Sequence, residues 1–197
     1  MKLRTSYTLL NLWRRGQYTQ AIEYYLRLRQ ITSQAIEEGT MYDQYATEWV
    51  DLYKKLPEEW GGDELISPQS QVKIEVSYND MADLVAVLDI LDEKVLWENK
   101  TGDSKDSADY ATDFQIPIYF VACELKGIPV DYAIINHYNQ MLPISNSNPD
   151  RTKIWNTEKE RERGKNFLNT LIPEIYQYFI DNAIPLDNKS NIGYNSK

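Results

Sequence analysis

Two short apolar runs near the middle of the chain give the first expectation for its fold. Residues 82–90 and 95–102 are separated by the charged turn Asp92-Glu93-Lys94, and both runs are rich in aliphatic side chains. This pattern indicates a hairpin between mostly buried strands. Residues 72–78 alternate apolar and polar side chains, which predicts a half-exposed strand leading into the hairpin. Residues 130–138 predict a further strand.

Helical patterns occupy much of the remaining chain. The predicted helical segments are residues 6–29, divided at Gly16, 31–56, about 109–126 and about 157–181, with 139–156 mostly loop. Gly127-Ile128-Pro129 is a stop signal for the third segment, and Thr157 with Glu160 forms a capping-box pattern at the start of the last. The pattern predicts an α/β (α+β) fold in which helices flank a central mixed sheet. We expect a single domain over residues 1–184 and a polar, disordered tail over 185–197.

Charged residues within the second apolar run are the first indication of chemistry. Side chains alternate along a strand, so Glu98 and Lys100 share a face while Trp97 packs on the other. Buried charges are costly unless something compensates them, and a divalent cation would do so. Asp83, on the adjacent predicted strand, could supply a second carboxylate. The alternative is a cross-strand ion pair with Asp83 as an edge-strand charge.

These residues resemble the motifs of the PD-(D/E)XK nucleases, in particular the RecB-like, phage-type exonuclease branch. Asp83 resembles the first acidic residue of the family, Glu98-Asn99-Lys100 its (D/E)-x-K triplet, and Gln115 with Tyr119 its Q-x-x-x-Y helix motif. The resemblance implies a restriction-endonuclease-like core with an N-terminal helical segment. It also implies a metal-dependent deoxyribonuclease, most typically an exonuclease that leaves 5′-phosphate products in recombination, repair or phage DNA processing.

The resemblance further implies which groups hold the metal. Asp83, Glu98 and the Asn99 backbone carbonyl would bind Mg²⁺ or Mn²⁺, with Lys100 and Gln115 acting on water or phosphate. Asp43 occupies the position of a family histidine, which would make an all-oxygen site suited to Mg²⁺. The same departure could instead mean that this helix does not reach the metal. Glu48 is a weaker candidate for supporting the site.

Composition limits the partners and the compartment. The net charge of −9 is unusual for a chain whose expected partner is DNA, as linear duplex or single-stranded ends. Basic residues concentrate in residues 1–30 and acidic ones in 37–64, so a basic N-terminal face could grip phosphates. Homo-oligomerisation or a partner protein could supply further affinity for DNA.

Cys123 is the only cysteine in the sequence, which excludes both a disulfide framework and a four-cysteine iron–sulfur cluster. Without a membrane-spanning stretch or a signal-peptide core, we expect a soluble, cytoplasmic protein, with a phage-encoded origin as one option.

Two other functional classes stay open. The chain could be a catalytically silent nuclease-fold subunit that only binds. Residues 16–25 are also similar to the first helix of a tetratricopeptide repeat, which would make the chain a helical interaction module. That architecture needs several stacked copies of its unit, and no second copy is evident in the sequence.

Overall fold

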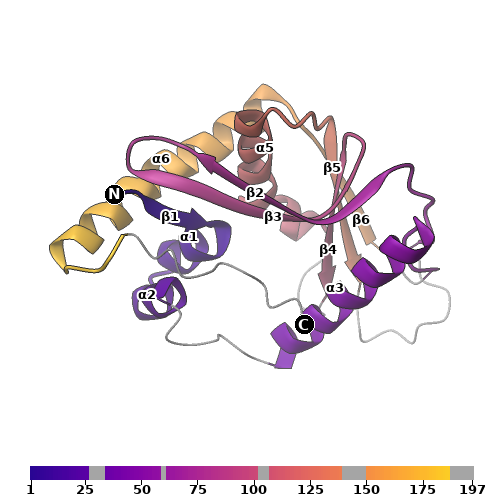
Figure 1. The fold of residues 1–197 in the computed structure, drawn as a ribbon, viewed down its shortest axis with the longest axis horizontal. Coiled ribbons are helices and arrows are strands. Elements are labelled where there is room, and N and C mark those ends of the chain that lie inside the picture. Colours follow the sequence, from indigo (N-terminus) through magenta and orange to yellow (C-terminus); the bar gives the residue numbers. More distant parts are fainter. Residues whose placement is uncertain (27–33, 59–60, 102–106, 139–149, 187–197) are drawn as a thin grey trace.

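The computed structural model describes residues 1–26, 34–58, 61–101, 107–138 and 150–186. Within these residues the chain forms a six-stranded mixed sheet with helices packed against it (Figure 1). The strands are β1 (Leu3–Ser6), β2 (Pro68–Ser77), β3 (Ala82–Asp92), β4 (Val95–Thr101), β5 (Tyr132–Tyr138) and β6 (Asp150–Trp155). The helices are α1 (Tyr7–Arg14), α2 (Tyr18–Leu26), α3 (Gln34–Tyr53), α4 (Ser107–Ala111), α5 (Gln115–Lys126) and α6 (Glu158–Asp181). The predicted α/β architecture is confirmed, and the all-helical alternative is wrong.

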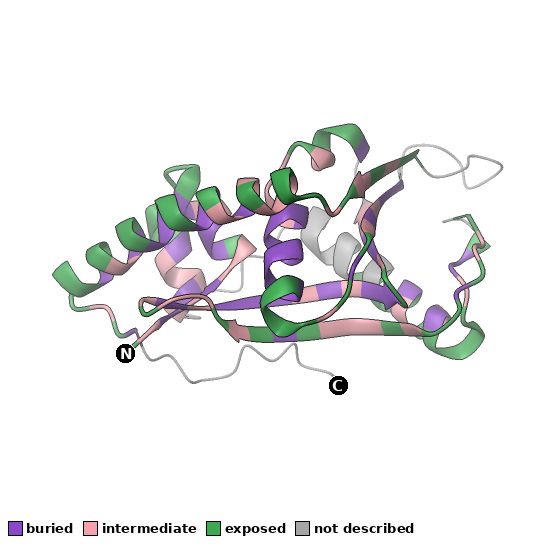
Figure 2. Cartoon of the chain, turned by 90° about the horizontal axis from the view of Figure 1, so that it is seen from above, coloured by how far each residue is buried: buried purple, intermediate pink, exposed green. Residues whose placement is uncertain are grey.

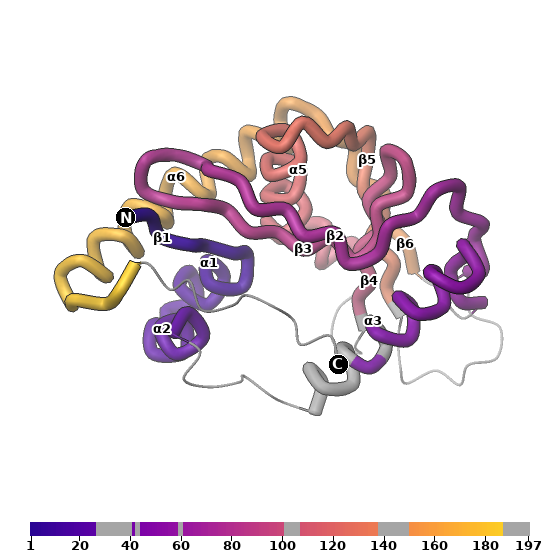
Figure 3. Tube along the Cα trace, viewed as in Figure 1, coloured from indigo at the N-terminus to yellow at the C-terminus, as the bar shows by residue number. Residues whose placement is uncertain are grey.

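Strand β3 organises the sheet, which has the order β1-β3-β4-β5-β6 with β2 also paired to β3. β2 runs antiparallel along almost the whole length of β3, and Figure 3 shows this long twisted pair crossing the molecule. β1 pairs in parallel with the beginning of β3, at residues 82–85, whereas β4 pairs antiparallel with its end, at residues 90–92. β4 then continues in parallel with β5, which pairs antiparallel with β6. The strands β3 and β4 therefore diverge after three residue pairs.

Two apolar clusters hold the helices to the sheet. The larger one joins the sheet to α1, α2, α5 and α6, and α5 is buried along most of its length (Figure 2). The smaller one places Ala46 and Val50 of α3 against Ile90 and Trp97 of the hairpin. α1 lies beside β1 at one end of the molecule, and α3 lies beside β4 at the other (Figure 1). Within the described residues, no helix combines the length and the apolar character needed to cross a membrane.

The local signals read from the sequence account for most helix ends. Ser6 caps α1, Gly127 ends α5 in the left-handed region with φ 73°, and Thr157 caps α6 by accepting the Glu160 amide. Gly16, with φ 72°, separates α1 from α2 as predicted. A glycine tolerates this conformation without the steric cost that other residues meet.

Several predicted boundaries differ from the structure. The segment predicted as one helix over 109–126 is divided into α4 and α5, and β6 forms within residues 139–156, which we predicted to be mostly loop. β1 was not predicted either. Leu186, which falls within the predicted tail, is buried, and its carbonyl accepts the Tyr25 hydroxyl. Residues 187–197, the rest of that predicted tail, lie outside the described residues.

Candidate functional site

Glu98 and Lys100 of β4 point to the same side of the sheet, as the strand alternation predicts. The Lys100 ammonium lies 2.5 Å from Glu98 Oε1, and the Glu98 residue is only 2% exposed. Trp97, on the other side, joins the cluster beneath α3. A buried carboxylate is thus held by a charge-assisted hydrogen bond from the lysine two residues later.

The first residue of α5 approaches the same carboxylate from outside the sheet. Gln115 Nε2 donates to Glu98 Oε1 at 2.6 Å and lies 2.8 Å from the hydroxyl of Tyr119, one helical turn later. The i, i+4 spacing of glutamine and tyrosine places both side chains on one helix face. The structure therefore brings together four residues that the sequence singled out: Glu98, Lys100, Gln115 and Tyr119.

Asp83 does not join this group, so the prediction that it converges with Glu98 is wrong. It lies at the beginning of β3, where its Cα pairs with those of Arg4 in β1 and Ser77 in β2. Its carboxylate is 3.7 Å from the Lys2 ammonium at the surface. Position 89 lies six steps further along the strand, which corresponds to about 20 Å of extended chain.

The register of the hairpin brings a different aspartate to the site. Ile90 pairs with Trp97, so extending this register by one residue sets Asp89, which precedes Ile90, against Glu98. Asp89 Oδ2 accepts the backbone amide of Asn99 at 2.8 Å. The sequence did contain this signal, because counting outward from a two-residue turn at 93–94 pairs 89 with 98. The resemblance to the family had assigned the acidic position to Asp83 instead.

One oxygen of the central carboxylate lacks a partner. Glu98 Oε1 accepts from both Lys100 and Gln115, whereas the buried Oε2 has no hydrogen-bond partner among the described residues. A buried anionic oxygen without a partner is unfavourable unless a cation compensates it. Asp89, Glu98 and the Asn99 carbonyl offer oxygen atoms only, which is the donor set that Mg²⁺ prefers. These residues fit a hard divalent cation.

A further carboxylate ligand from α3 stays a prediction. In the part of the chain that the structure describes, no group of three or more His, Cys, Asp or Glu side chains is arranged to hold a metal. Asp43 belongs to the α3 backbone, but its side chain lies outside the described residues. Glu48 is exposed and accepts a hydrogen bond from Gln44 on its own helix.

A polar chain supports the opposite face of β4. Asn136 of β5 donates to Asn99 Oδ1 at 3.5 Å and accepts from Arg151 Nε of β6 at 3.0 Å. Arg151 in turn pairs with Asp63. Asn136 is buried, and its bond reaches the residue that separates Glu98 from Lys100. The network therefore fixes the strand segment that carries both charged side chains.

Tyr110 of α4 is a neighbour of the site that the sequence did not reveal. The Lys100 ammonium lies 5.9 Å from the centre of the Tyr110 ring. The centre of the His137 ring, on β5, lies 5.6 Å from the centre of the same tyrosine ring. Burial raises the pKa of the Tyr110 hydroxyl, an effect that the positive charge of Lys100 opposes. His137 itself is buried on β5, where its Cα pairs with that of Lys100.

Comparison with known proteins identifies the fold. The sequence matches no family model and no curated protein. A solved structure from Eubacterium rectale, named "Putative exonuclease", covers 91% of this chain and 82% of its own, with a TM-score of 0.63 and 16% identity. The alkaline exonuclease LHK-Exo of Laribacter hongkongensis, in complex with dAMP, covers 92% and 93%, with a TM-score of 0.52 and 12% identity. The chain therefore shares its fold with these two structures. The shared fold agrees with the predicted central mixed sheet flanked by helices.

The predicted basic N-terminal face takes a different form in the structure. Lys2, Arg4 and Arg14 form ion pairs with Asp83, Glu75 and Asp113. Internal carboxylates therefore partly neutralise these cations, which weakens the attraction that they would exert on phosphates. Arg27 and Arg29, also counted in that predicted face, lie outside the described residues.

Proposed function

We propose that this protein is a divalent-metal-dependent deoxyribonuclease, and specifically an exonuclease that hydrolyses phosphodiester bonds at DNA ends to 5′-phosphate products. The observation that carries the proposal is the buried Glu98 carboxylate: Lys100 and Gln115 hold one oxygen, and the other has no hydrogen-bond partner among the residues that the structure describes. Asp89 lies opposite it at the point where β3 and β4 diverge. The fold that the chain shares with the two exonuclease structures is consistent with this chemistry.

Each side chain has a separate part in the proposed reaction. Asp89, Glu98 and the Asn99 carbonyl would hold Mg²⁺ or Mn²⁺. When bound, such an ion withdraws electron density from a phosphate and lowers the pKa of a water molecule. Lys100, which is partly exposed, would orient the attacking water and offset the negative charge that develops on the phosphate. Gln115, braced by Tyr119, keeps the Glu98 carboxylate in one orientation.

The proposed substrate is DNA with free ends, as linear duplex or single strands. LHK-Exo, which shares the fold, has been captured with dAMP, a single nucleotide. Recombination, repair and phage DNA processing each require the trimming of such ends. The net charge of −9 and the internally paired cations of the N-terminal region favour a partner protein or an oligomer that supplies further affinity for DNA.

Two aspartates on one strand provide the test. Purified wild type, Asp89→Asn and Asp83→Asn would be incubated with linear and circular DNA in Mg²⁺ or Mn²⁺. Asp89→Asn should lose about 10²-fold or more of the activity, because it removes a charge that the cation needs, while Asp83→Asn should keep it. Degradation of linear DNA alone would establish exonuclease action.

Opposite behaviour of the two variants would refute the assignment of Asp89. Metal binding without any cleavage, measured by calorimetric titration with Mn²⁺, would instead indicate the catalytically silent binding subunit. In that case wild type and Asp83→Asn would bind Mn²⁺ but leave both DNA forms intact.

A further inference from the structure

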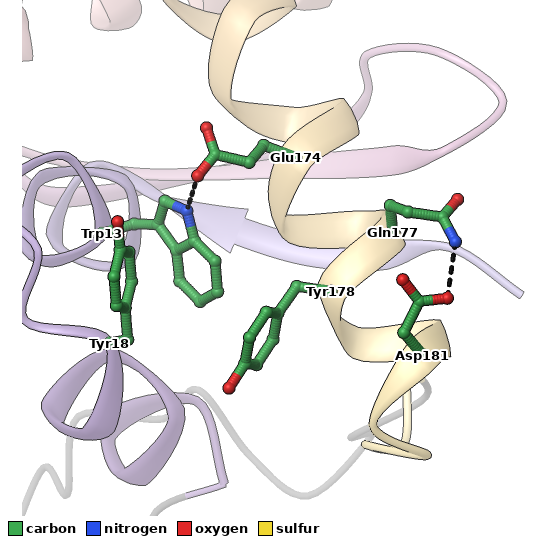
Figure 4. Close-up of a pocket in the computed structure, with 6 residues that line it drawn as sticks. All are labelled: Trp13, Tyr18, Glu174, Gln177, Tyr178 and Asp181. Carbon is green, nitrogen blue, oxygen red and sulfur yellow. Dashed lines mark hydrogen bonds between the residues drawn. The ribbon is translucent and has the colours of Figure 1, made fainter.

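A surface cavity of about 470 Å³ lies between the N-terminal helices and the second half of α6, on elements that do not carry the candidate catalytic residues. It is lined by Trp13, Tyr18, Glu174, Gln177, Tyr178 and Asp181. Figure 4 shows the three aromatic side chains in a row, with Glu174 on one side and the Gln177–Asp181 pair beside Tyr178. The cavity thus combines aromatic walls with two carboxylates.

Packing fixes the aromatic walls. The ring centre of Trp13 lies 4.7 Å from that of Tyr18 and 5.0 Å from that of Tyr178. Trp13 is buried, which anchors the row in the core, whereas Tyr18 and Tyr178 are 45% and 37% exposed. The outer rings therefore keep part of their surface available to a ligand. Aromatic faces carry partial negative charge and attract cations.

Hydrogen bonds fix the carboxylates as well. Glu174 Oε1 accepts the indole N–H of Trp13 at 2.8 Å, and Asp181 accepts the amide of Gln177 at 2.7 Å. Both donors are neutral, so the negative charge of each carboxylate is not cancelled by its partner. Among the described residues that line the cavity there is no Lys, Arg or His. The wall therefore has a net negative potential directly beside the aromatic rings.

The same protein holds a cation between two rings elsewhere. On β5 and β6 the Lys153 ammonium lies 3.4 Å from the ring centre of Tyr132 and 4.0 Å from that of Trp155. There the cation comes from the chain itself. The α1–α6 cavity offers comparable rings, together with carboxylates, at an open surface.

We propose that this cavity binds the guanidinium group of an arginine side chain from a basic segment of a partner protein. A planar guanidinium stacks on aromatic rings and donates to carboxylates at the same time, which suits both parts of the wall. An acidic chain of net charge −9 also favours a basic partner.

The test uses the full chain and a matched pair of short peptides. Acetyl-Gly-Arg-Gly-amide would be compared with the same peptide containing citrulline, which has nearly the same shape but no charge. Binding would be followed through the indole N–H signal of Trp13, assigned among the five tryptophans with a Trp13→Phe variant. The arginine peptide should shift this signal in a saturable way, and the citrulline peptide should not.

Variants at exposed or isosteric positions separate binding from folding. Glu174→Gln keeps an acceptor for the indole and removes the charge, and Tyr178→Leu removes one ring. Each should weaken binding of the arginine peptide by about 5- to 10-fold. Glu162→Gln on the same helix and Tyr53→Leu on α3 are the matched controls and should bind like wild type.

Three outcomes would overturn the proposal: equal shifts with the citrulline peptide, full binding by Glu174→Gln and Tyr178→Leu, or a shift with free spermidine but none with the arginine peptide. The last would assign the cavity to a small soluble polyamine. None of these measurements depends on DNA cleavage, so their outcome is independent of the proposed nuclease activity.

Discussion

Metal-linked stability provides the sharpest prediction for the site, and the variant Glu98→Gln tests it. In wild type, one buried oxygen of Glu98 accepts hydrogen bonds and the other has no partner within the described part of the chain. A bound cation should therefore stabilise the folded state over the unfolded chain. At a metal concentration about 100 times the dissociation constant, this linkage contributes about 2.7 kcal/mol. For a chain of this size, that corresponds to a rise of roughly 5–10 °C in the unfolding midpoint.

Without metal, the free energy of unfolding of Glu98→Gln should lie within about 1–2 kcal/mol of the wild-type value. The glutamine oxygen still accepts from Lys100 and Gln115, and each bond weakens by about 1 kcal/mol when the acceptor loses its charge. Replacing a partnerless anionic oxygen by a neutral amide recovers about 1–3 kcal/mol, which offsets that loss. The variant should therefore fold normally and lose the response to Mg²⁺.

The assay is thermal unfolding of wild type, Glu98→Gln and the exposed control Glu75→Gln over a series of Mg²⁺ and Mn²⁺ concentrations. Wild type and the control should show the same concentration-dependent rise, and Glu98→Gln should show none. A full rise in Glu98→Gln would refute the reasoning, because the carboxylate could then not be a ligand. A flat response in all three proteins would refute it equally.

Three further predictions follow from the packing and the polar contacts. Asn136→Leu removes the contact to Asn99 and should lower the free energy of unfolding by about 1–3 kcal/mol. It should also raise the Mg²⁺ concentration needed for half-maximal cleavage. A metal titration of the activity measures this second effect, which a purely structural role would not produce. Gly164→Ala should destabilise the protein by about 1–3 kcal/mol in chemical denaturation, because the added methyl group would lie 2.6 Å from the Pro117 carbonyl oxygen. Burial raises the pKa of the Cys123 thiol to about 12, so the thiol stays protonated at pH 8; iodoacetamide should modify it only after denaturation, as mass spectrometry would show.

The sequence predicted those parts of the site that depend on local periodicity. Strand alternation placed Glu98 and Lys100 on one side, and helical spacing placed Gln115 and Tyr119 on one helix face. That this helix face meets Glu98 was implied by the family resemblance. The turn near Glu93 was also predicted correctly, and its left-handed φ of 51° is consistent with a tight hairpin. These features are set within a few residues of chain, so one sequence suffices to read them.

It was harder to predict from the sequence which acidic residue of β3 lies at the site, because that strand carries three aspartates with different environments. Asp83 pairs with Lys2 at the surface, Asp92 accepts the amides of Ile66 and Ser67, and Asp89 faces the candidate site. Only the register between strands distinguishes them. β6 was not predicted for a related reason. It lies at the sheet edge with largely exposed side chains, so its hydrogen-bonded pairing with β5, rather than its own apolar pattern, makes it a strand.

The divergence of β3 and β4 explains why Asp89 is suited to the role that we assign to it. In an uninterrupted antiparallel ladder, the Asn99 amide would donate to the main chain of β3. Pairing stops after Ile90 and Trp97, and the amide donates to the Asp89 carboxylate instead. The side chain thus satisfies a main-chain donor that the divergence would otherwise leave without a partner. Asp89→Asn keeps an acceptor for that amide, whereas Asp89→Ala would also release the strand. Loss of activity in the asparagine variant can therefore be attributed to the missing charge, and any additional loss in the alanine variant measures how far the strand geometry itself contributes.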